Sequence, residues 1–264
     1  MSDAVWAVKL LAAPALIGLA SIAGRRWGPG AAGMLGGLPL VGGPVVLTLW
    51  LTEGVDYAAQ VAQSAPAGVW ANIVYMLTLA ALSARWRWFI AIPLAWACYL
   101  AAALLLHAAG LAQSLPLGIA VVPALWLAAH RGLPRVAMPS SPVRLPHVEL
   151  LARVAAAAAL VLTLTGLSAH LGAQLTGVLS GAPVAAVVIP AFTLANAGRG
   201  ALLATLRGFL LGLMGFSVFF LILGRGLQHH AALALVAALA GGAGTGLLAA
   251  RQSRPAFAAP ATAD

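Results

Sequence analysis

The chain has 264 residues, of which 62% are hydrophobic and 7% are charged, and its formal net charge is +9. About a quarter of the residues of a typical soluble domain are charged, so this composition excludes a water-facing surface of ordinary size. Together with a mean hydropathy of +1.01, it predicts an integral membrane protein whose main partner is the lipid bilayer.

Apolar runs long enough to cross a bilayer, which takes about 20 residues, follow one another along the chain. No segment alternates apolar and polar residues over a strand length, so we expect an all-α polytopic membrane protein and not a β-barrel. The nine predicted spans are 4–24, 30–52, 57–84, 87–108, 113–130, 149–170, 174–196, 200–224 and 229–250. They divide the chain into a first unit over 1–130, a cytoplasmic linker over 131–148, a second unit over 149–250 and a disordered tail over 251–264.

The first predicted span, 4–24, has an acidic residue before it and two arginines after it. This charge order is the reverse of that of a signal peptide, so we expect the segment to stay in the membrane. Lys9 in this span and Arg153 in span 149–170 each lie about one helical turn inside the first span of their unit. They either extend to the interface or form a symmetric pair of gate charges.

Span 30–52 has a dense series of glycines and prolines at its centre. Proline removes a backbone donor, and each glycine weakens a helix by about 1 kcal/mol relative to alanine, so we expect the helix to break at mid-membrane. The exposed backbone groups would then bind a substrate, or the glycines would serve only close helix packing. The residues of this break that we assign to substrate binding are Gly37, Pro39, Gly42, Gly43 and Pro44.

Span 30–52 either crosses the membrane or folds back as a re-entrant hairpin. If all nine spans cross, most arginines of the loops and ends fall on one side, which the positive-inside rule makes cytoplasmic. A hairpin would divide these arginines between the two sides. We therefore favour the crossing, which places the N-terminus outside and the C-terminus in the cytoplasm, in a bacterial plasma (inner) membrane.

Polar residues near the predicted spans are few. Glu53 and Asp56 follow span 30–52 and form either the mouth of a pathway with a coupling proton site or a solvated loop. Asn72 and Tyr75 share one helical face with Thr78 and could line a substrate path. Thr48, Ser180 and Thr193 lie in or just after the breaks and are assigned to the same path, although a lone threonine or serine more often bonds its own backbone.

An offset of 144 residues aligns the two units without a gap. The alignment pairs identical residues: Gly28 with Gly172, Gly33 with Gly177, Leu35 with Leu179, Gly37 with Gly181, Pro39 with Pro183, and Gly54 with Gly198. Five spans precede the second unit, and because this number is odd, we expect the unit to enter the membrane from the opposite side. Ser180, Gly181 and Pro183 then form a second break in a position equivalent to the first, the pattern that marks the site of many transporters.

Other chemistry has little support in the sequence. We expect almost no charge in the middle of the spans, and the single cysteine excludes an internal disulfide and a cysteine-based metal cluster. The histidines form no metal motif, no nucleophile has an evident base, and no basic face suits nucleic acid. We therefore expect no enzyme, no metal and no cofactor.

These patterns favour a small secondary transporter or exporter of a small polar or anionic organic solute, bound between the two broken helices. A passive channel or facilitator would use the same breaks as a filter. A membrane scaffold subunit without transport is a third interpretation, and a homodimer is one arrangement that the sequence allows.

Overall fold

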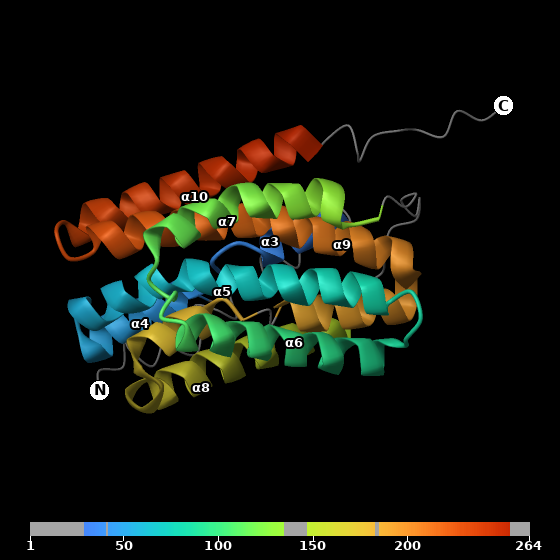
Figure 1. The fold of residues 1–264 in the computed structure, drawn as a ribbon, viewed down its shortest axis with the longest axis horizontal. Coiled ribbons are helices and arrows are strands. Elements are labelled where there is room, and N and C mark those ends of the chain that lie inside the picture. Colours follow the sequence, from blue (N-terminus) through green and yellow to red (C-terminus); the bar gives the residue numbers. More distant parts are fainter. Residues whose placement is uncertain (1–28, 41, 135–146, 183–184, 254–264) are drawn as a thin grey trace.

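The computed structural model of the chain describes residues 29–40, 42–134, 147–182 and 185–253. All regular elements among these residues are helices, as the composition predicts. In chain order they are α3 (Pro29–Gly36), α4 (Gly42–Glu53), α5 (Val55–Leu82), α6 (Trp88–Ala108), α7 (Leu115–Leu127), the π-helical turn η2 (Ala128–Gly132), α8 (His147–Ser180), α9 (Ala185–Gly226) and α10 (Ala231–Ser253) (Figure 1).

Among the described residues, five helical stretches are long and apolar enough to cross a membrane. They are Val55–Leu82, Trp88–Ala108, Leu115–Gly132, Ile189–Gly226 and Ala231–Ala249. This confirms a helical chain with several membrane-spanning candidates, and the count of nine spans stays a prediction.

The helix ends follow from local chemistry. After α6, Gly110 adopts a φ of 68°, a left-handed conformation that commonly ends a helix. Before α7, the Ser114 side chain accepts a hydrogen bond from the Leu117 amide at 3.5 Å, which caps the first turn. Two longer helices contain kinks at glycines: Gly172 divides α8 into 147–171 and 173–180, and Gly198 divides α9 into 185–197 and 199–226.

The core lies between α5 and the 199–226 segment of α9, which run side by side in opposite directions (Figure 1). At one end, the Gln63 side-chain amide donates to the Gly224 carbonyl at 2.8 Å. At the other end, the Arg199 guanidinium donates to the Ala80 carbonyl at 3.5 Å. Any membrane that both segments cross is therefore crossed in opposite directions.

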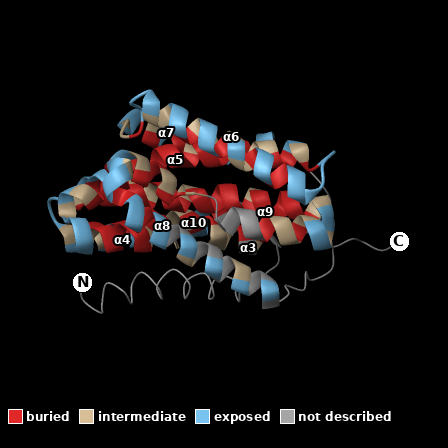
Figure 2. Cartoon of the chain, turned by 90° about the horizontal axis from the view of Figure 1, so that it is seen from below, coloured by how far each residue is buried: buried red, intermediate tan, exposed pale blue. Residues whose placement is uncertain are grey.

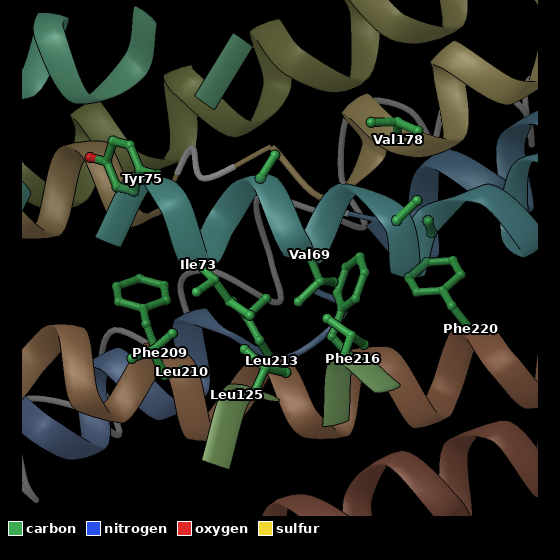
Figure 3. Close-up of a cluster of buried hydrophobic side chains, with 14 of the residues drawn as sticks. Val69, Ile73, Tyr75, Leu125, Val178, Phe209, Leu210, Leu213, Phe216 and Phe220 are labelled. Carbon is green, nitrogen blue, oxygen red and sulfur yellow. The ribbon is translucent and has the colours of Figure 1, made fainter. Parts of the chain in front are cut away.

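Apolar side chains fill the space between these two helices. Val69 and Ile73 of α5 face Phe209, Leu213 and Phe216 of α9 (Figure 3). Of the most apolar stretch of α5, 67% is buried, and for α9 the figure is 72%, against 22% for α10. Exposure is concentrated on the outer helices, where lipid would cover the apolar side chains (Figure 2).

Helix α3 packs along α9, and the chain continues in the same direction to the first residue of α4, which packs on α5 and α8. Gly33 of α3 lies against Thr205, Gly37 lies against Gly212, and Gly42 at the start of α4 lies against Phe216 and Phe220. Beyond α4, the Asp56 carboxylate accepts a hydrogen bond from Gln228 at 2.8 Å. The crossing of a membrane by span 30–52 stays a prediction.

Candidate functional site

Both predicted breaks coincide with the end of one helix and the start of another. In the first, α3 ends at Gly36 and α4 begins at Gly42, while the Gly43 amide donates to the Pro39 carbonyl at 3.0 Å across the gap. In the second, α8 ends at Ser180 and α9 begins at Ala185. The backbone turns on itself at both ends: the Leu40 amide donates to the Leu38 carbonyl at 2.7 Å, and the Ala182 amide donates to the Leu179 carbonyl at 2.9 Å.

A second pair of equivalent features follows each break. Gly54 has φ 93° and ψ 172°, and Gly198 has φ 78° and ψ −177°. This region of backbone conformation is essentially restricted to glycine. The two glycines are 144 residues apart, and the helical segments that they begin, 55–82 and 199–226, have the same length.

Close contacts between the units repeat at the same offset. A β-carbon on Gly33 would collide with the Thr205 carbonyl, and one on Gly177 would collide with the Val61 carbonyl. At the offset of 144 residues, Gly33 corresponds to Gly177 and Val61 corresponds to Thr205. The contact of Gly33 with Thr205 is therefore the counterpart of the contact of Gly177 with Val61, with the roles of the two units interchanged.

The glycines of α5 and α9 repeat the pattern. A β-carbon on Gly68 would meet the Val178 carbonyl, and one on Gly212 would meet the Met34 carbonyl. Gly68 and Gly212 are 144 residues apart, and so are Met34 and Val178. In each unit, the short half-helix before the break therefore packs backbone to backbone on the long helix of the other unit.

The second break meets α5 at Asn72, a buried residue with 1% of its surface exposed. Its side-chain amide donates to the Gly181 carbonyl at 2.8 Å and to the Gly68 carbonyl of its own helix at 3.1 Å. Asn72 and Gly181, which the sequence analysis assigns to one site, are therefore joined by a direct hydrogen bond. Tyr75 is also buried but points away from the apolar cluster that faces α9 (Figure 3).

Phe216 lies between the two breaks. Its Cε2 is 3.1 Å from the position of a β-carbon on Gly42, and its Cζ is 3.2 Å from that position on Gly181. Phe216 corresponds to Asn72 at the offset of 144, so equivalent positions of the two long helices meet at the same level.

The protein-family models, curated proteins and solved structures with which the chain was compared contain no match to it. Its function must therefore be inferred from the chemistry of this site. In the described ranges, no three His, Cys, Asp or Glu side chains gather in a group that could hold a metal ion.

The remaining predicted site residues are distributed along the same helices. Pro39 and Gly43 are half-buried, Pro44 is buried, and Thr193 is 4% exposed. Ser180 donates to the Gly177 carbonyl of its own helix at 2.7 Å, which is the backbone bond expected of a lone serine. Thr48 is fully buried, and its hydroxyl has no hydrogen-bond partner.

The gate residues that the structure describes, Glu53, Asp56 and Arg153, lie away from the breaks. Glu53 and Asp56 are exposed at the junction of α4 and α5, where Asp56 accepts the bond from Gln228 of the second unit. Arg153 lies in α8, and only its backbone is described. Lys9 and Pro183 lie outside the described residues.

Arg207, a charged residue to which the sequence analysis assigns no role, lies inside the 199–226 segment. Its guanidinium donates to the Ala129 carbonyl at 2.9 Å and to those of Leu133 and Pro134 at 3.4 and 3.3 Å. A long apolar sequence around Arg207 hides one charge from a hydropathy average. The charge itself, an arginine in an apolar helix, was the signal that could have identified it.

Proposed function

We propose that the protein is a small secondary transporter of a small polar or anionic organic solute, built from two inverted repeats. The substrate would bind where the described residues of the two breaks, 37–40 and 181–182, meet the middle of α5 and α9. One repeat would move against the other and open the site to each side of the membrane in turn. The N-terminus would lie outside and the C-terminus in the cytoplasm.

The observation that carries this proposal is the exchange of contacts between the units. Gly33 packs on Thr205 as Gly177 packs on Val61, and the long helices that carry Thr205 and Val61 are antiparallel. Two units related in this way can exchange conformations, because each contact has a counterpart of the same shape in the other unit. Such an exchange would convert an outward-open form into an inward-open one.

The chemistry of the breaks supports a polar ligand. The half-helices that begin at Gly42 and at Ala185 direct the positive ends of their dipoles into the gaps. Oriented amides of this kind bind an anionic or polar group without a charged side chain. The carbonyl ends at Gly36 and Ser180 offer acceptors to the same ligand.

The topology can be tested with thiol labelling in sealed vesicles. Cys98→Ser removes the single native thiol, and cysteine is then introduced at Thr52 or at Asn196, which are exposed and 144 residues apart. Inverted repeats require a membrane-impermeant methanethiosulfonate to reach these two positions from opposite sides. Labelling of both from the same side would refute the repeat.

The mechanism can be tested with a pair of cysteines nearer the breaks. Thr48 and Phe192 are equivalent at the offset of 144, so Thr48→Cys and Phe192→Cys report on the two halves of the pathway. In a transporter, labelling of one from its side should prevent labelling of the other from the opposite side. Independent labelling from both sides would indicate a channel, and no labelling of either would indicate a scaffold.

A further inference from the structure

The Phe216 side chain occupies the centre of the proposed pathway. Only 3% of it is exposed, and its ring lies against Gly42 of the first break and Gly181 of the second. It packs on Phe220 with ring centroids 4.5 Å apart (Figure 3). Because neither glycine has a side chain, the ring lies directly against the backbone at both breaks.

The equivalent residue of the first unit makes a different interaction. Asn72 donates a hydrogen bond to the Gly181 carbonyl and so joins α5 to the second break. A phenyl ring has no hydrogen-bond donor, so Phe216 holds its neighbours only through packing. Packing contacts with a neutral ring are lost gradually as the ring rotates, whereas a buried hydrogen bond that is broken leaves an unsatisfied group.

We infer that Phe216 is the gate residue that closes the pathway at its midpoint and limits the size of the solute that passes. This inference rests on the proposed transport function. The ring blocks the space between Gly42 and Gly181, and a solute crosses when the ring rotates away from both glycines. Asn72 stays in place against Gly181 and offers its carboxamide oxygen to the passing solute.

The test uses the full-length protein reconstituted in phospholipid vesicles, with permeability to urea and to glycerol measured by stopped-flow light scattering. Phe216→Ala should raise glycerol permeability above wild type about tenfold or more, since this corresponds to lowering the barrier by about 1.4 kcal/mol. Sucrose should remain excluded from the same vesicles, which separates an opened pathway from a damaged bilayer.

Phe209→Ala provides the matched control. Phe209 lies on the same helix and is 2% exposed, but its ring touches only the first break, at Gly36. It should leave glycerol permeability near that of wild type. Phe216→Leu keeps much of the buried volume and should give a smaller increase, so it serves if the alanine variant does not fold.

The outcomes separate this inference from the transport proposal. Equal permeability of the Phe216 variants and the Phe209 control would overturn the gate, whereas mutually exclusive labelling at Thr48→Cys and Phe192→Cys would still support transport. If labelling at those two positions were independent and Phe216→Ala still admitted glycerol, the transport mechanism would be refuted and Phe216 would remain the barrier of a channel.

Discussion

Asn72 and Phe216 are equivalent residues of two antiparallel helices, and both lie against Gly181. One interaction is a hydrogen bond and the other is packing, so two residues that are 144 positions apart contact the same glycine by different chemistry. This combination suits a transporter, which needs two similar halves to alternate and a specific group to recognise its solute.

Asn72→Leu should lower the free energy of unfolding by about 1–3 kcal/mol, because the Gly181 carbonyl loses its buried partner. Leucine keeps the branched shape of the side chain and removes its hydrogen-bonding groups. The measurement is denaturant unfolding in detergent, monitored by tryptophan fluorescence. Ser217→Ala is the control: its buried hydroxyl bonds only the Leu213 carbonyl of its own helix at 2.8 Å, and its loss should cost less. Equal effects would show that the bond to Gly181 has no special role.

Gly33→Ala and Gly177→Ala should destabilise the protein by similar amounts, about 1–3 kcal/mol each, because each new methyl group would collide with a backbone carbonyl. Backbone atoms cannot rotate aside as a side chain can. Gly244→Ala in α10, where a β-carbon meets nothing within 4 Å, should be neutral or stabilising. The thermal stability of all three variants is measured by heating each sample and then determining the folded fraction by size-exclusion chromatography. A large effect at only one of the two contact glycines would contradict their equivalence.

The sequence predicts most of the helical fold because apolar runs and the offset of 144 are visible in it. The segment expected at 57–84 is α5 (Val55–Leu82), and the segment expected at 87–108 is α6 (Trp88–Ala108). Gly37 and Pro39 identify the first break directly, since few residues oppose a helix more strongly.

The sequence does not predict which apolar side chains meet at the centre. Phe216 resembles every other phenylalanine of its span until the packing of α3 and α9 is known. The offset of 144 held a signal for it, because it places Phe216 opposite Asn72, a residue already assigned to the site. Whether a glycine such as Gly54 adopts a positive φ depends on the path of the chain on both sides of it, which composition does not encode.

Gly54→Ala and Gly198→Ala should each cost about 1–3 kcal/mol, because a side chain disfavours the backbone conformation of both glycines. Neither β-carbon would meet an atom within 4 Å, so the cost comes from the backbone alone. Gly166→Ala, in an open position of α8, is the control and should not destabilise. Unfolding midpoints in detergent give the comparison. Unchanged midpoints for Gly54→Ala and Gly198→Ala would mean that the chain takes another path at these two junctions.

Arg207→Met should release the turn at the end of α7. The guanidinium binds the carbonyls of Ala129, Leu133 and Pro134, which a helix end would otherwise leave without donors. Hydrogen bonds to a charged group contribute about 1.5–3 kcal/mol each, so local opening should become much more frequent. Trypsin should then cleave after Arg131 faster than in wild type, as followed by the appearance of two fragments. Arg225→Met at the exposed end of α9 should leave the rate unchanged, and an unchanged rate for Arg207→Met as well would show that the turn is held by packing instead.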